Sequence, residues 1–206
     1  MPTPQTSSPT ALTRPYGGVE IPAVGTYDLD VAHTTVEFIA RHLMITKVRG
    51  RFATFSGSVH IAETPEDSSV EVTIDPASVD TSQAQRDEHL RSGDFLDVEH
   101  HPTMTFNSTS VAAGEDGGWK VSGDLTLRGV TRPVVLDVEF DGAGTTPWGS
   151  RAVAFSASTE IDREDWGLTY NQALEAGGVV VSKKVRIELN VEATAREQAQ
   201  QEQGAA

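Results

Sequence analysis

The chain has 206 residues, no cysteine and a formal net charge of −14, which arises from 16 basic and 30 acidic residues. The lack of cysteine excludes disulfides, thiolate zinc sites and cysteine nucleophiles. The acidic balance disfavours nucleic acids and anionic membrane surfaces as partners, since both require a basic surface, and we attribute it to solubility. The length suits one domain, and no apolar run approaches the ~20 residues of a membrane helix, so no integral membrane segment is expected.

Both ends of the chain are predicted to be flexible. Residues 1–24 contain five prolines among Thr and Ser and few large apolar side chains, so ordering them would cost entropy with little burial. We therefore expect an N-terminal extension that can be deleted without loss of stability. It lacks the basic start and apolar core of a secretory signal, which favours the cytoplasm. Residues 194–206 are rich in Gln, Glu and Ala and predict a flexible C-terminal tail, which leaves 25–193 as the folded domain.

The folded domain shows a repeated alternation of apolar and polar residues, which is typical of half-buried strands. Phe52 and Phe55 cannot share a face under strict alternation, so a bulge or bend is expected near Ala53 and Thr54. Strands without alternating amphipathic helices favour an all-β, antiparallel up-and-down barrel or a sandwich. About eight strands are predicted, within residues 36–42, 49–61, 70–75, 104–111, 119–127, 134–140, 153–161 and 185–191.

Residues 78–106 interrupt the alternation between two predicted strands. Ser82 can cap a short helix in the polar run that follows it. Phe95, Leu96 and Val98 are apolar residues in a loop, where a plain surface connection would be polar. We interpret the segment as a short helical lid whose apolar side chains plug one end of the barrel.

The interior of an eight-stranded barrel holds either packed side chains or one slender ligand. Small residues occur at predicted inward positions, namely Ala40, Gly123, Ala157 and Thr159. A barrel lined in this way can be under-filled by its own side chains. The alternative is that Phe and Trp side chains fill the gap.

Histidines are the main candidates for chemistry in this sequence. His33, His42, His60 and His89 could meet only through tertiary structure, and they define the alternative hypothesis of a metal-handling protein or an enzyme. We favour hydrogen-bonded or surface histidines, with His42 as a polar group inside an apolar tunnel. There is no Gly-x-Ser-x-Gly elbow and no recognisable acid/base spacing, so no catalytic residue, metal or cofactor is expected.

Four basic residues lie close together in this acidic chain: Arg41, Lys47, Arg49 and Arg51. They are candidates for binding an anionic headgroup such as a pyrophosphate. The alternative is a solvated strand face whose cations pair with nearby acids.

Ordered motifs along the chain resemble one protein family. They are Tyr27-Asp28-Leu29-Asp30, His33, Phe38, His42, Gly50, Phe52, Gly57, His89-Leu90-Arg91-Ser92, Asp94-Phe95-Leu96-Asp97, Pro102, Thr105-Phe106, the run 123–134 and Arg163-Glu164-Asp165-Trp166-Gly167-Leu168. In these motifs the chain resembles the YceI-like family over roughly residues 25–193. The resemblance implies a lipocalin-like eight-stranded antiparallel barrel that binds a polyisoprenoid or similar lipid, with no established catalytic residues. Dimers are common among proteins of this kind, so a homodimer is one expected state.

The predicted ligand is a long-chain lipid, either a polyisoprenoid of the quinone or polyprenyl phosphate type or a fatty-acid-like molecule. We expect the barrel to serve its binding, storage or transport. The residues predicted to line its site are Phe38, Ala40, His42, Phe52, Val72, Ile74, Leu90, Phe95, Met104, Phe106, Leu125, Phe155, Ala157, Trp166 and Leu168.

Overall fold

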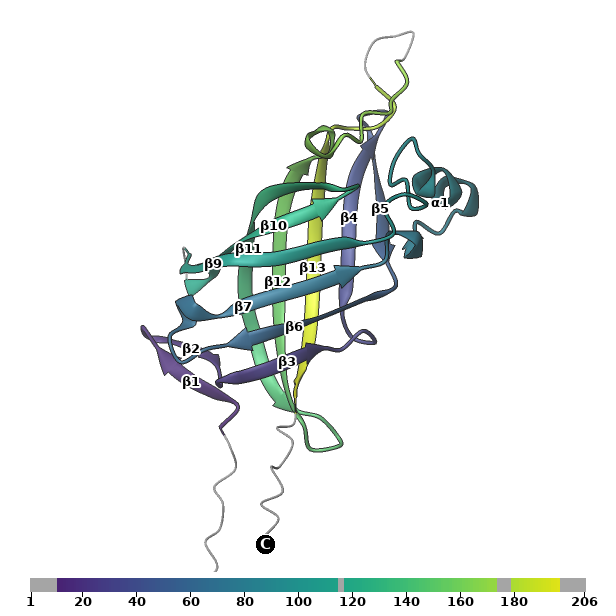
Figure 1. The fold of residues 1–206 in the computed structure, drawn as a ribbon. Helices are drawn as coiled ribbons and strands as arrows, with labels where there is room; N and C mark the ends of the chain where they lie inside the picture. The colour runs from purple at the N-terminus through teal and green to yellow at the C-terminus, as the bar shows by residue number, and fades with distance from the viewer. Residues whose placement is uncertain (1–10, 115–116, 174–178, 197–206) are drawn as a thin grey trace, which may run out of the picture.

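A computed structural model describes residues 11–114, 117–173 and 179–196 (Figure 1). Its strands form a long barrel with one short α-helix at its side, near one end. The strands are β1 (Thr13–Tyr16), β2 (Val19–Pro22), β3 (Gly25–Leu29), β4 (Thr35–His42), β5 (Thr46–Phe52), β6 (Phe55–Ile61), β7 (Ser69–Ile74), β8 (Val79–Asp80), β9 (Met104–Ala113), β10 (Trp119–Leu127), β11 (Val130–Thr145), β12 (Arg151–Asp162) and β13 (Lys184–Ala195).

The barrel is closed by strand β13. On one side β13 pairs with β12 along its whole length, and on the other side it pairs first with β4 and then with β3. Consecutive pairs β3/β4, β5/β6 and β7/β8 act as three bent strands, so the wall has eight antiparallel strands. The predicted barrel is therefore confirmed, and its closure excludes the sandwich alternative.

The bend predicted near Ala53 and Thr54 separates β5 from β6. There the Ala53 amide donates to the carbonyl of Ser78 at 3.2 Å, and the Asp75 amide donates to the carbonyl of Thr54 at 2.9 Å. These bonds replace the regular pairing, because the chain leaves β7 at this point and turns toward the lid. Phe52 and Phe55 can both be buried as a result.

The predicted lid contains the helix α1 (Ala84–Arg91), which lies beside the end of β5 in Figure 1. Gln83, one residue later than expected, caps the helix by accepting from the Arg86 amide. The buried Asp87 carboxylate accepts from the Thr81 amide at 2.9 Å, which fixes the helix to the strand before it. None of the helices among the described residues has the length and hydrophobicity of a transmembrane span.

The N-terminal segment differs from the flexible extension expected from its composition. Residues 1–10 lie outside the described residues, but β1 and β2 form an antiparallel hairpin. Ile21 is only 2% exposed, and the Tyr27 hydroxyl donates to the carbonyl of Ala23 at 2.8 Å. The composition was misleading here because one buried isoleucine and a few long-range hydrogen bonds are enough to order the hairpin.

The C-terminal boundary also lies slightly later than predicted. Strand β13 continues to Ala195, and Arg196 donates from Nε to the Asp28 carboxylate at 3.0 Å. Residues 197–206, the rest of the predicted flexible tail, lie outside the described residues.

We expect deletion of residues 2–24 to lower the melting temperature by roughly 5 °C or more, because it exposes the barrel surface that Ile21 covers. Ile21→Ala alone should reduce the free energy of unfolding by about 2–5 kcal/mol. Val19→Ala in the same strand, where the side chain is 36% exposed, is the matched control and should change it by less than ~0.5 kcal/mol. Equal effects of the two substitutions in denaturant unfolding would contradict the packing of this hairpin.

A candidate ligand cavity inside the barrel

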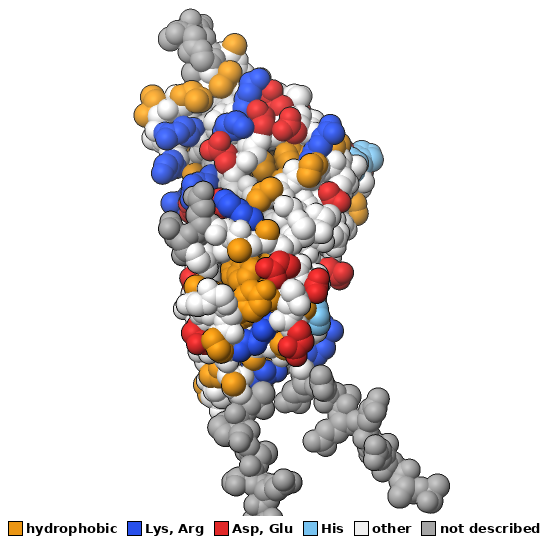
Figure 2. Space-filling model, turned by 90° about the vertical axis from the view of Figure 1, so that its left-hand side faces the viewer, with side chains coloured by type: hydrophobic (Ala, Val, Ile, Leu, Met, Phe, Trp, Pro, Cys, Tyr) orange, Lys and Arg blue, Asp and Glu red, His pale blue; other side chains and the backbone are white. Residues whose placement is uncertain are grey.

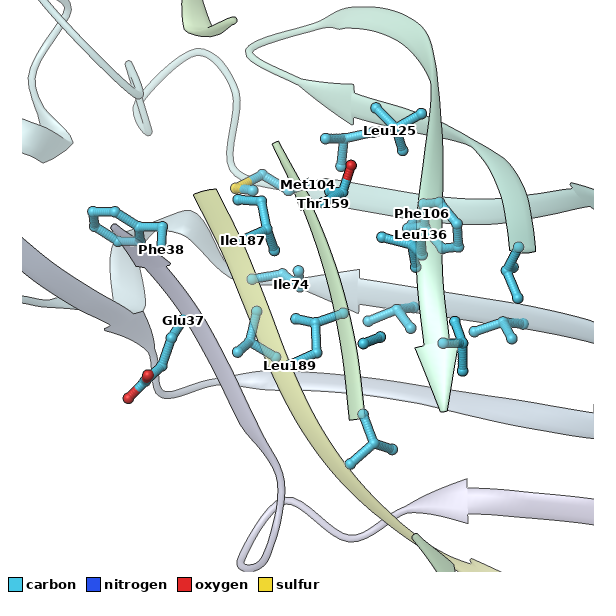
Figure 3. Close-up of a pocket in the computed structure, with 18 of the residues that line it drawn as sticks. Glu37, Phe38, Ile74, Met104, Phe106, Leu125, Leu136, Thr159, Ile187 and Leu189 are labelled. Carbon is cyan, nitrogen blue, oxygen red and sulfur yellow. The ribbon is translucent and has the colours of Figure 1, made fainter. Parts of the chain in front are cut away.

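An apolar cavity of about 310 Å³ runs inside the barrel. This volume is at the lower end of the range usual for ligand pockets, about 300–1,000 Å³. Figure 3 shows side chains from several strands that converge on this space, among them Ile74, Met104 and Ile187. Glu37 of β4 also borders the cavity, but its carboxylate points away from the other side chains and pairs with Arg49 on the outer surface at 3.6 Å. The interior wall is therefore almost wholly apolar.

Most of the residues predicted to line a ligand site border the cavity in the structure. In β12, Phe155, Ala157 and Thr159 all face the cavity, as the period of two requires. The predicted residues that the structure places in the cavity wall are Phe38, Ala40, Phe52, Val72, Ile74, Leu90, Phe95, Met104, Phe106, Leu125, Phe155, Ala157 and Leu168.

Two predicted lining residues lie elsewhere. His42 ends β4 as an exposed residue that bridges to Val181, so the prediction of a histidine within the tunnel was wrong. Trp166 is 2% exposed but packs in the core beside the cavity, where its indole Nε1 donates to the carbonyl of Leu125 at 3.0 Å. His42 has the same strand parity as Phe38 and Ala40, but as the last residue of β4 it lies beyond the cavity and is exposed. The indole N–H of Trp166 finds its partner in the barrel wall.

Small inward residues have two different roles. A Cβ on Gly50 would lie 2.3 Å from the Phe38 ring, and one on Gly123 would lie 2.4 Å from the Phe106 ring. These glycines thus make room for aromatic rings of the neighbouring strands. Ala40 and Ala157, in contrast, border the open cavity. Aromatic rings therefore fill the interior beside Gly50 and Gly123, whereas the interior stays open beside Ala40 and Ala157.

The lid closes one end of the cavity, as predicted. Phe95 and Leu96 are each 7% exposed and line the space. The Phe95 ring contacts those of His89 and Tyr170, with centroids 5.1 and 5.2 Å away. Arg128, in the β10–β11 turn, holds the lid loop by donating to the carbonyls of Phe95 at 3.1 Å and Gly93 at 2.8 Å. The role of Arg128 was not visible in the sequence.

The opposite end of the cavity is formed partly by the N-terminal hairpin. Ile21 and Pro22 line the space together with Pro65 of the loop between β6 and β7. Sequence reasoning missed Ile21 and Pro22 because they were assigned to the flexible extension. The short alternation of Val19 and Ile21 was the signal that could have identified the strand.

The four clustered cations lie on the outer face of β4 and β5 rather than in the cavity. Arg49 pairs with Glu188 at 3.1 Å, and Arg51 pairs with Asp80 at 3.0 Å. Arg41 and Lys47 face each other across the hairpin and are exposed. The guanidinium groups of Arg49 and Arg51 already have carboxylate partners. For these two residues, a solvated strand face paired with nearby acids is therefore the better description.

The four candidate histidines do not form one cluster in the described parts of the chain. His60 contacts the Thr26 hydroxyl at 3.2 Å, and His89 contacts Asp94 at 2.9 Å. His33 lies near Asp30 and Glu192, in a group whose candidate ligand atoms lie within 4.8 Å of one another. The Asp30 carboxylate raises the pKa of His33, which is 2.8 Å away, so this exposed group is an ordinary ion pair when the histidine is protonated.

Arg163 lies in the cavity wall, although the sequence pointed to it only as part of the motif that runs to Leu168. It is 4% exposed and begins the 3₁₀ helix Arg163–Trp166 directly after β12. Its Nε donates to the carbonyl of Ser182 at 3.0 Å, and its Nη1 donates to the carbonyl of Leu168. Nη2 has no hydrogen-bond partner in the described structure. Burial lowers the pKa of this guanidinium, since a cation loses hydration inside an apolar wall.

A closed eight-stranded antiparallel barrel around an apolar cavity defines the lipocalin-like class of fold. A family model described as YceI-like domain matches residues 27–193. A UPF0312 protein of Vibrio campbellii is 42% identical over 140 residues, which cover 68% of this chain and 74% of that protein. The chain therefore belongs to the YceI-like family, as the sequence motifs indicated.

Solved structures show the same architecture. The Campylobacter jejuni YCEI protein matches with a TM-score of 0.65 at 30% identity, over 76% of this chain and 90% of that chain. A polyisoprenoid binding domain from Saccharophagus degradans matches with a TM-score of 0.64 at 19% identity, over 84% of this chain and all of that one. At 19% identity, this second match shows that the two proteins share a fold.

We expect Phe95→Ala and Leu96→Ala each to lower the free energy of unfolding by about 2–5 kcal/mol, as truncation of core residues does. Both side chains sit in a loop by sequence but are buried as deeply as strand residues. Ile45→Ala, at a turn residue that is 76% exposed, should cost less than ~0.5 kcal/mol. Denaturant unfolding measures all three, and neutral values for Phe95 and Leu96 would mean that the lid does not plug the barrel.

Proposed function

We propose that this protein binds a long-chain lipid, of the isoprenoid or fatty-acid-like type, inside its barrel and thereby stores or carries it. The observation that supports this function best is the cavity itself, which is apolar along the barrel and bordered by Phe, Ile, Leu and Val side chains. Membership of the YceI-like family and the fold shared with a polyisoprenoid binding domain support lipid binding in general. The chain type and its headgroup are part of our proposal.

The physical driving force is the removal of apolar surface from water. A slender hydrocarbon chain gains roughly 25 cal/mol for each Å² of apolar surface that it buries. Part of this gain is offset by the loss of translational and conformational freedom of the chain. Binding of this kind needs a long continuous apolar wall and no catalytic group, and it is consistent with where the structure places the predicted lining residues.

The positions of the histidines give little support to the alternative of a metal-handling protein or an enzyme. His42 and His33 are exposed, at the end of β4 and in the turn before that strand, and His60 and His89 contact a hydroxyl and a carboxylate. We therefore propose binding rather than catalysis.

Extraction of the purified protein with organic solvent, followed by mass spectrometry, tests the proposal directly. A long-chain lipid recovered in near-stoichiometric amount supports it. Stoichiometric metal without lipid, found by elemental analysis of the same preparation, would instead support the metal-handling alternative.

A substitution within the cavity offers a sharper test. Ala157→Trp should abolish lipid binding while circular dichroism stays unchanged, because the new indole occupies the space of the ligand and not of the core. Ser158→Trp is the matched control, since Ser158 is the next residue of β12 and faces outward. Lipid binding by Ala157→Trp that equals binding by Ser158→Trp would place the ligand outside the barrel.

A further inference from the structure

We propose that Arg163 is the headgroup site of the barrel and that it binds a ligand whose head carries an anionic oxygen, as in a carboxylate or a phosphate monoester. The inference rests on the proposed lipid-binding function and adds to it the position, the chemistry and the orientation of the head. The apolar wall defines where the chain of the ligand lies, and Arg163 defines which end of the ligand lies at the lid.

Arg163 continues the inward face of β12. Phe155, Ala157, Thr159 and Ile161 alternate along that strand and line the cavity, and Arg163 occupies the next inward position. It is the one Lys or Arg side chain in the cavity wall among the described residues. A ligand with its head at Arg163 and its chain extending to Phe155 would follow eight residues of strand, or roughly 26 Å.

The guanidinium forms no direct ion pair with a described carboxylate, although the charges of Asp162 and Glu164 act on it from farther away. No carboxylate lies within ion-pair distance of Arg163 in the described parts of the chain, and its neighbour Glu164 pairs with Lys183 at 2.7 Å. Buried cations are normally paired, because an isolated charge in an apolar wall is costly. The two carbonyl oxygens that accept from Nε and Nη1 hold the group in place but do not neutralise it.

One donor group of Arg163 is left free in the described structure. Nη2 carries two N–H groups and is buried without a partner. An oxygen of a carboxylate or phosphate at this point would satisfy the donors and place a negative charge in direct contact with the guanidinium, which is the strong, charge-assisted type of hydrogen bond. The Phe95 ring lies 6.0 Å from the guanidinium carbon and covers the site from the lid. The lid would therefore close over the head of the ligand.

Two ligand pairs that differ only in the head test this site: geranylgeranyl phosphate with geranylgeraniol, and hexadecanoate with hexadecanol. Dissociation constants are measured by calorimetry on the delipidated full chain. The parent protein should prefer the anionic member of at least one pair about tenfold or more, since a charge-assisted hydrogen bond is worth at least that factor. Whichever pair shows the preference distinguishes a phosphate head from a carboxylate head.

Arg163→Met should remove this preference and leave the affinity for the alcohol within about threefold, because the chain contacts remain. Arg49→Met is the matched control on the outer face and should keep the preference of the parent. Loss of the preference in Arg49→Met, or its persistence in Arg163→Met, would place the head elsewhere and overturn the inference.

Folding of the variants is checked by circular dichroism, since Met removes two donors to carbonyl groups. If Arg163→Met does not fold, Arg163→Lys decides: a reduced preference supports the fork-shaped donor, and an unchanged preference contradicts it. If no member of either pair binds the parent, the proposed function itself fails. If alcohols and anions bind the parent equally well, lipid binding stands and the headgroup role of Arg163 is wrong.

Discussion

The pairing of β13 with neighbours on both sides is the constraint on which the rest of the structure depends. Once the sheet is closed, every second side chain of each strand must face a common interior that water does not freely fill. Aromatic rings occupy part of that interior by packing over Gly50 and Gly123, and the positions of Ala40 and Ala157 leave the remainder open. The apolar cavity is thus a direct result of closure combined with small residues at a few inward positions.

The two ends of the barrel are covered by different segments. One end is covered by the lid, which Arg128 and Asp87 fix through hydrogen bonds to backbone groups. The other end is bordered by the β1/β2 hairpin, where the apolar Ile21 and Pro22 line the cavity and Arg14 donates to the carbonyl of Ala62 at 2.7 Å. Arg163 makes the interior itself asymmetric, because it places a positive charge near the lid and leaves the hairpin end apolar.

Sequence reasoning was most accurate where a short-range rule decides the outcome. Period-two alternation predicted the inward residues of β12, and its failure at Phe52 and Phe55 predicted the bend between β5 and β6. Sequence reasoning failed where contacts with distant segments determine the role of a residue. Ile21 is buried by strands that follow it much later in the chain. Arg128 has its role because it binds the lid loop. Arg163 was not predicted as a lining residue, because no local pattern reveals that its Nη2 lacks a hydrogen-bond partner among the described residues.

Closure also restricts how a bound molecule can leave. Where neighbouring strands are paired, the wall offers no gap through which a long chain could slip sideways, so the chain would have to slide along its own axis toward an end. At one end the lid with Phe95 blocks that path, and at the other Ile21 and Pro65 narrow it. Residence time would then depend on local opening of a covering segment and on the length of chain still to be withdrawn, while the sheet stays intact. A molecule held as we propose would thus leave without unfolding of the barrel.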